Sequence, residues 1–270
     1  MARIESAFFD LAVLDRLACG ETSIHRLDPR AKLLTTFAFI VCVVSFGPYQ
    51  VLPLLPFLIF PIFLVARAGL PVSVLLKKLA LAAPFALAVG IFNPIFDREI
   101  LLHIGPLGIS AGWVSFCSIA LRILLTLSAV LILVATTGFA TVCLGLEKLG
   151  APRPFVQQLL FLYRYLFLLV DEGSRLVRAR RLRSFGRRGL ELRPYAALLG
   201  QLLLRTLARA QAIHRAMLSR GFNGRLHRLQ PLNAGARDWL FLCGWCGLFL
   251  LLRSTNLPLL LGQLITGGHP

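Results

Sequence analysis

Charged residues are scarce in this chain of 270 residues, and acidic residues are scarcer than basic ones. Asp, Glu, Lys and Arg together make up 15% of the sequence, whereas hydrophobic residues make up 57%. A soluble globular domain has about 25% charged residues and about 45–50% apolar ones. With a mean hydropathy of +0.76, the composition therefore predicts that lipid, rather than water, covers much of the protein surface.

The sequence also lacks the motifs of catalytic and metal-binding sites. It has no Gly-x-x-x-x-Gly-Lys phosphate loop and no Gly-x-Ser-x-Gly motif, and its five histidines are scattered. Cys243 and Cys246 have the spacing of a redox or metal pair, but they lie in an apolar run without a second pair or a nearby histidine. We therefore predict that this chain has no catalytic residue, binds no metal and needs no cofactor of its own.

Five apolar stretches predict an all-α, polytopic membrane protein with about five transmembrane helices. The stretches cover residues 33–46, 51–66, 79–96, 113–135 and 239–252. Several are shorter than the roughly 20 residues that a straight span needs, so we expect flanking residues to extend the helices.

Basic residues gather on alternate connections between these stretches. They are Arg26, Arg30 and Lys32 before the first stretch, and Arg67, Lys77 and Lys78 between the second and the third. Residues 47–50 are uncharged and residues 97–99 are nearly balanced. Because positive loops stay in the cytoplasm, we expect the N-terminus and residues 155–237 to be cytoplasmic and the C-terminus to lie outside.

Arg122 interrupts the longest apolar stretch and is expected near the middle of the membrane. A charge at that depth is costly and normally faces the bundle interior or a wet cavity. Two interpretations stay open. Arg122 is either a polar anchor or part of a moving interface, or it is a structural arginine that snorkels or is paired locally.

The chain divides into three predicted regions: residues 1–154 with four membrane helices, the arginine-rich residues 155–237, and residues 238–270 with the last membrane helix. Within the arginine-rich region, residues 155–170 suit a helix at the membrane interface. Basic amphipathic helices are expected from Asp171 and again after Pro194.

The arginine-rich region could contact anionic lipid, bind nucleic acid or dock an acidic protein partner. No base-reading or stacking motif accompanies the charge, so we do not expect nucleic acid. Arginine is used here almost to the exclusion of lysine. That preference favours docking, because the planar guanidinium makes directional, bidentate bonds to carboxylates.

Two short signatures end the predicted basic helices. They are Leu-Arg-Ser-Phe-Gly at 182–186 and Ser-Arg-Gly-Phe-Asn-Gly at 219–224. In each, an arginine is followed by a small residue and a phenylalanine, and a glycine is expected to end the helix. A small residue beside the arginine lets the backbone of a partner come close.

With these signatures, the chain resembles the transmembrane (T) component of energy-coupling factor transporters, in the cobalt and nickel branch. The resemblance includes Leu-Asp-Pro-Arg-Ala-Lys at 27–32, Phe-Asn-Pro-Ile-Phe-Asp at 92–97 and Ala-Met-Leu-Ser-Arg-Gly-Phe at 216–222. In that family, two Ala-Arg-Gly-like motifs end long cytoplasmic coupling helices, and their arginines enter grooves on two ABC-type ATPase subunits. By position, the motif residues here are Arg183 with Ser184 and Arg220 with Gly221.

The resemblance implies a non-enzymatic scaffold in the bacterial inner membrane. ATP hydrolysis would belong to the two ATPase subunits, and the cobalt or nickel ion to a separate substrate-binding (S) membrane subunit, with or without a small auxiliary membrane subunit. The alternative is a membrane-embedded enzyme acting on lipid or isoprenoid phosphates, with arginines holding the phosphate. Only Asp171 and Glu172 have suitable positions as its acids, and they are equally explained as acids at a helix N-terminus.

Overall fold

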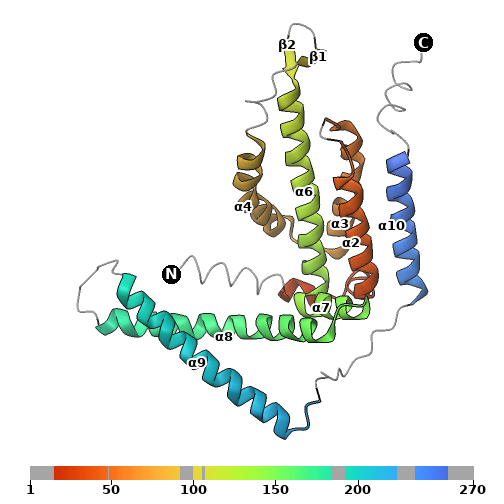
Figure 1. Cartoon of the computed structure of the whole chain (residues 1–270). Helices are drawn as coiled ribbons and strands as arrows, with labels where there is room; N and C mark the ends of the chain where they lie inside the picture. The colour runs from red at the N-terminus through yellow and green to blue at the C-terminus, as the bar shows by residue number, and fades with distance from the viewer. Residues whose placement is uncertain are drawn as a thin grey trace. The chain divides into compact units, whose positions relative to one another are not determined.

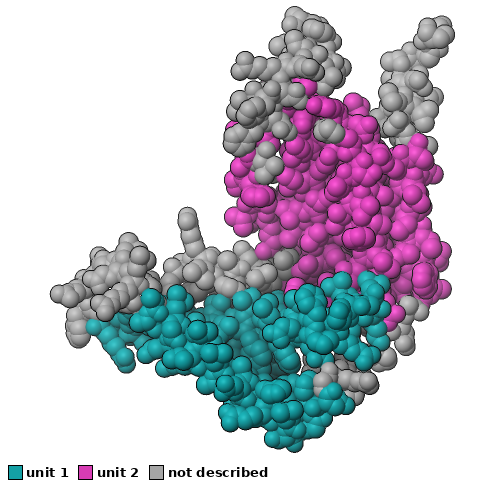
Figure 2. All heavy atoms as spheres, in the orientation of Figure 1, with its two compact units in different colours: residues 1–13, 146–231 teal, residues 14–145, 232–270 magenta. Residues whose placement is uncertain are grey.

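The computed structural model describes residues 15–47, 49–91, 100–104, 107–183, 192–223 and 235–254. They fall into two compact units, coloured separately in Figure 2. Unit 1 is described through residues 146–183 and 192–223. Unit 2 contains the described residues from 15 to 145 together with residues 235–254.

Unit 2 is a bundle of helices (Figure 1). Its elements are α2 (Pro29–Val44), the 3₁₀ helix η1 (Leu52–Leu58), α3 (Ile59–Ala68), α4 (Val72–Gly90), α6 (Ala111–Thr137) and α10 (Ala236–Ser254). Helix α2 packs against α6 and α10, α3 also packs against α6, and α4 lies along another side of α6. Helix α7 (Phe139–Lys148) follows α6 in the chain.

Local sequence explains where these helices begin and end. Asp28 caps α2, because its side chain accepts a hydrogen bond from the backbone N–H of Arg30, and Pro29 occupies the first turn. The second apolar stretch was expected as one helix, but it begins as the 3₁₀ helix η1, where Pro53 and Pro56 remove backbone donors. Gly69 ends α3 in the left-handed conformation, with φ +63°.

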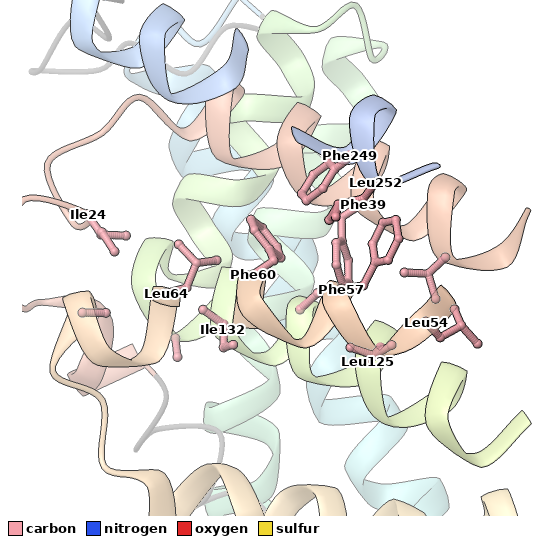
Figure 3. Packing of buried hydrophobic residues seen from close by; sticks show 14 of the residues in the cluster. Ile24, Phe39, Leu54, Phe57, Phe60, Leu64, Leu125, Ile132, Phe249 and Leu252 are labelled. Carbon is pink, nitrogen blue, oxygen red and sulfur yellow. The ribbon is translucent and has the colours of Figure 1, made fainter. Parts of the chain in front are cut away.

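The core of unit 2 is a cluster of aromatic rings (Figure 3). Phe39 of α2 lies 4.7 Å from Phe60 and 5.4 Å from Phe249, measured between ring centroids. Phe57 of η1 closes the cluster beside Phe249. Each such pair contributes about 0.5–1.5 kcal/mol beyond the burial of apolar area, so the cluster holds α2, η1, α3 and α10 together.

One described helix, α6, is long and apolar enough by itself to cross a membrane; it has 27 residues. All five apolar stretches contribute to helices, but the number of spans stays a prediction. Large apolar side chains also remain exposed on the outside of unit 2, among them Leu81, Phe85 and Leu240, each more than 70% exposed. Such a surface suits contact with lipid.

The all-α expectation holds for the body of both units, with one exception. Strands β1 (Ile100–Ile104) and β2 (Leu107–Ser110) form an antiparallel pair in which Ile104 lies opposite Leu107. The sequence signal for this pair is the Gly-Pro dipeptide at 105–106, a turn former between two short runs rich in Ile and Leu.

Unit 1 contains two long helices, α8 (Arg153–Arg183) and α9 (Leu192–Ser219). The helix boundary expected at Asp171 is wrong, because α8 runs unbroken through that residue for 31 residues. Asp171 and Glu172 therefore lie inside a helix and not at its N-terminus. Pro194, by contrast, lies in the first turn of α9, where proline is tolerated.

Candidate functional site

Helices α8 and α9 are joined by polar and close contacts within unit 1. Arg205 of α9 donates from Nη1 to Oε1 of Glu172 over 2.6 Å. Gly173, next to Glu172, lies against Leu202 of α9. A Cβ atom placed on Gly173 would be 3.8 Å from the Leu202 side chain, an ordinary van der Waals distance. Asp171 pairs with Arg175 one turn along the same helix, at 2.8 Å. Both acids that the alternative enzyme would need are therefore engaged by arginines.

The two helices run in opposite directions and enclose a groove. The N-terminal half of α8 and the C-terminal half of α9 line it together, and its volume is about 640 Å³. Its walls are mainly apolar, with Phe161 and Leu166 on one side and Ile213 and Met217 on the other. The predicted amphipathic character of these helices thus corresponds to a real apolar surface between them.

The end of α9 carries the second arginine signature in a defined geometry. Gly221 is left-handed, with φ +77°, and its N–H donates to the Leu218 carbonyl over 3.0 Å. The N–H of Phe222 donates to the Met217 carbonyl, also over 3.0 Å. This pair of bonds is the Schellman motif, in which glycine closes the helix. Arg220 is the C-cap residue, and its side chain is exposed.

The first signature lies at the opposite end of the helix pair. Arg183 is the last residue of α8, and its side chain is exposed. At about 1.5 Å per residue, Arg183 lies about 17 Å and Arg220 about 22 Å from the Glu172–Arg205 contact, in opposite directions. Ser184 lies outside the described residues. The structure therefore places the two arginines at separate sites.

Neither arginine is neutralised within the described part of unit 1, where no acidic side chain lies within ion-pair distance of Arg183 or Arg220. Each also follows the negative end of a helix dipole, which favours a cation there. Among the described residues of unit 1, no carboxylate therefore competes for either guanidinium group.

Arg122 lies in unit 2 and contacts the end of α2. Its Nη2 donates to the carbonyl of Gly47, just beyond α2. Arg253 of α10 reaches the same helix end, with a bond of 3.1 Å to the Ser45 carbonyl and its guanidinium 4.3 Å from the centre of the Phe46 ring. These contacts favour the locally paired, structural interpretation of Arg122. The contact of Arg253 was not predicted from the sequence. Its position, a basic residue in the last turn of an apolar helix, could have indicated it.

A buried polar cluster at the other end of unit 2 was also missed. The backbone N–H of Asp28 donates to Oδ1 of Asp238 over 2.9 Å. Lys32 donates from Nζ to the carbonyls of Thr136, at 3.1 Å, and His25, at 3.3 Å. Asp28, Lys32 and Asp238 are each at most 8% exposed. The cluster ties the start of α2 to the end of α6 and the start of α10.

A sequence signal for the cluster existed in the spacing Gly235-x-x-Asp238. The N–H of Gly235 donates to Oδ2 of Asp238 over 2.7 Å, so the acid at the third position of α10 caps its own helix. Among the described residues, no group of three or more His, Cys, Asp or Glu side chains is arranged to hold a metal ion.

Comparison with known proteins identifies the family. The sequence profile of the CbiQ family, described as cobalt transport protein, matches residues 20–231. The energy-coupling factor transporter transmembrane protein EcfT of Lacticaseibacillus paracasei is 26% identical over 265 residues, which cover 91% of this chain and all of the relative. EcfT of Listeria innocua is 26% identical over 78% of this chain and 85% of its own length. The cobalt transport protein CbiQ of Salmonella typhimurium is 34% identical over 54% of this chain and 71% of its own length.

The profile match covers the bundle helices α2, α3, α4 and α6 and both arginine-rich helices. The matched residues include Asp28, Arg183 and Arg220, on which the resemblance was based. The chain therefore belongs to the CbiQ family and is a transmembrane (T) component of an energy-coupling factor transporter.

Proposed function

We propose that this chain is the coupling subunit of an importer for cobalt or nickel ions, and that it binds two ABC-type ATPase subunits through Arg183 and Arg220. The observation that carries the proposal is the pair of exposed arginines at the C-terminal ends of α8 and α9, which are opposite ends of the helix pair. No acidic side chain in the described part of unit 1 neutralises either arginine. One arginine at each site matches a partner that presents two equivalent acidic grooves.

The energy available at each site is sufficient for specific docking. Removing one partner from a buried, hydrogen-bonded charge pair at an interface costs about 2–5 kcal/mol, much of it from the charge left unpaired. An arginine that stays exposed contributes only about 0–1 kcal/mol. The two signature arginines should therefore matter far more than the other arginines of these helices.

The α8–α9 pair is also suited to transmit motion. Both helices are long, at 31 and 28 residues, and the Glu172–Arg205 contact joins them between the two docking arginines. A displacement of either arginine by an ATPase would therefore move both helices together. In this proposal the motion reaches a separate S subunit, which binds the metal ion, and ATP is hydrolysed by the partners alone.

Cobalt as cargo is supported by the CbiQ family description and by the name of the Salmonella relative. Nickel rests only on the resemblance to the cobalt and nickel branch of the family. The proposed location is the bacterial inner membrane, with the N-terminus and residues 155–237 in the cytoplasm. An impermeant thiol reagent should therefore label a cysteine introduced at position 268 of intact cells but not one at position 190. The reverse labelling would exclude this orientation.

The docking proposal is tested with Arg183→Ala, Arg220→Ala and the double variant, expressed with the ATPase and S subunits. We expect each single change to reduce co-purification of the ATPases and cobalt or nickel uptake at least tenfold, and the double change to abolish both. Arg178→Ala and Arg215→Ala are matched controls, because both side chains are exposed on the same two helices.

If these controls were as damaging as the signature variants, the attraction would be diffuse and the specific docking model would fail. Loss of uptake with ATPase binding intact in the Arg183 and Arg220 variants would place these arginines in transmission and not in docking.

A further inference from the structure

A cavity of about 810 Å³ opens in unit 2 where α2 and α10 begin and α3 ends. Three arginines from three separate segments line it: Arg26 precedes α2, Arg67 is in the last turn of α3, and Arg237 is in the first turn of α10. All three side chains are exposed. The charge at this cavity therefore comes from the tertiary structure and not from one run of basic sequence.

The positive charge of the cavity is largely available to a ligand. Glu21 also lines the cavity, but its contact with Arg26 is long, at 3.7 Å, and both side chains are at least 75% exposed. Within the described residues, neither Arg67 nor Arg237 has an acidic partner at ion-pair distance. Asp238 also lines the cavity, but both of its oxygens accept backbone N–H groups.

A buried lysine and the start of α10 add positive electrostatic potential at the cavity. Buried Lys32 lies close enough to Asp238 and Asp28 for electrostatic attraction, so the carboxylate of Asp238 is balanced from inside the protein. Gly235 and Ala236 at the start of α10 also line the cavity, and the N-terminus of a helix favours an anion. The polar side of the cavity thus suits a phosphate group.

The cavity also has an aromatic lining. Phe63 of α3 and Phe241 of α10 line the cavity, and both pack against Trp245, with ring centroids 5.2 Å and 6.4 Å apart. Ile62 of α3 and Leu240 of α10, their neighbours in sequence, are 63% and 74% exposed. A small free anion would make no use of such a lining.

An exposed tryptophan beside the cavity favours a position at the membrane interface. Trp239 follows Asp238 directly and is 61% exposed, and exposed tryptophans are enriched where a helix crosses from water into lipid. Arginines beside aromatic and aliphatic surface, at the end of a membrane bundle, form the kind of basic pocket in which anionic lipid headgroups bind.

We propose that this cavity binds the phosphate headgroup of an anionic phospholipid, with Arg26, Arg67 and Arg237 as the phosphate ligands and Phe63 and Phe241 against the acyl chains. The guanidinium groups would make paired hydrogen bonds to phosphate oxygens. The bound lipid would fill the space between the starts of α2 and α10 and the end of α3. This site is independent of the proposed ATPase docking, which uses unit 1 alone.

The test is a titration of the purified full-length chain with phosphatidylglycerol, followed by native mass spectrometry. Phosphatidylcholine with the same acyl chains and inorganic phosphate are the two comparison ligands. We expect phosphatidylglycerol to be retained at least tenfold more tightly than phosphatidylcholine. We expect millimolar inorganic phosphate not to displace it. Equal retention of the two lipids would overturn the proposal, and displacement by phosphate would assign the site to a free anion instead.

Variants locate the site. Arg67→Gln and Arg237→Gln should each weaken retention of phosphatidylglycerol about fivefold, the effect expected for one basic residue near an anionic surface, and the double variant should lose both contributions. Arg16→Gln is the matched control, because Arg16 is exposed in unit 2 but does not line the cavity. Unchanged lipid retention in the double variant would refute the site. If that variant instead lost ATPase co-purification, the cavity would be a protein contact.

Discussion

Removal of the Asp238 carboxylate tests whether the buried cluster stabilises unit 2. In the Asp238→Ala variant, the backbone N–H groups of Asp28 and Gly235 lose the acceptors that they now reach at 2.9 Å and 2.7 Å. The side chain is 8% exposed, so water replaces few of these bonds. The variant also removes one of the two acidic neighbours of the buried Lys32.

The expected loss of stability follows from these contacts. A hydrogen bond to a charged group contributes about 1.5–3 kcal/mol, and removing one member of a buried charged pair costs about 3–5 kcal/mol. Because the same group makes both bonds, the terms overlap, and we expect a total of about 4 kcal/mol. At about 2–4 °C per kcal/mol for a chain of this size, the apparent Tm should fall by about 10 °C.

The assay is thermal unfolding of the purified full-length protein in detergent, followed by the loss of monodisperse elution. Asp238→Asn should lose about half as much, because its single carbonyl oxygen can replace only one of the two acceptors. Asp171→Ala is the control. Its pair with Arg175 has side chains 59% and 71% exposed, and such pairs contribute about 0–1 kcal/mol. An Asp238→Ala protein with a Tm within about 2 °C of the wild type would show that the cluster does not hold the helix ends together.

Three other expectations follow from the same contacts. Gly221→Ala should lower stability by about 1–2 kcal/mol, because an L-residue is strained at φ +77° even though its Cβ would meet nothing within 4 Å; Gly221→Asn should lose less, and co-purified ATPase should fall in the same order. Arg122→Lys should keep assembly and uptake, whereas Arg122→Ala removes one of the two donors to the Gly47 carbonyl, which keeps only the Gln50 N–H at 3.2 Å, and should lower stability by about 1 kcal/mol; loss of uptake by Arg122→Lys with assembly intact would instead point to a moving interface. Burial lowers the pKa of the His25 imidazole below its usual 6.5, although its hydrogen bond to the Leu17 carbonyl acts in the opposite direction. The unfolded chain then binds more protons than the native one, so this stability is present above about pH 6.5 and declines below it; the protection factors of the amides at residues 17–28, which correct for the base-catalysed intrinsic exchange rate, should be lower at pH 5.5 than at pH 7.5, and His25→Gln should remove the difference.

Local sequence patterns predicted the elements that depend on neighbours in the chain. Each of the five apolar stretches contributes to a helix in its described residues, and Asp28 and Pro29 start α2. Helix α9 ends at Gly221, the small residue of the second signature, and not at the expected glycine after the phenylalanine. Capping and turn residues act within one or two helical turns, which is why a single sequence can reveal them. The break expected at Asp171 was wrong for a related reason. The crowding of charge looked like a new helix, but the contacts of Asp171 and Glu172 with Arg175 and Arg205 let α8 continue.

The composition by itself predicted a membrane protein, and short motifs carried the resemblance to the energy-coupling factor family, because hydropathy and motifs are properties of the chain alone. The partners of Arg122, the Asp28–Asp238 bond and the cavity with Arg26, Arg67 and Arg237 were decided only by the tertiary structure. Asp28 and Asp238 are separated by 210 positions in the sequence, and no periodic pattern connects residues so far apart. The ends of α2, α3, α6 and α10 come together only because these helices pack around the aromatic cluster that contains Phe39. This packing also brings together charged residues that are far apart in the sequence.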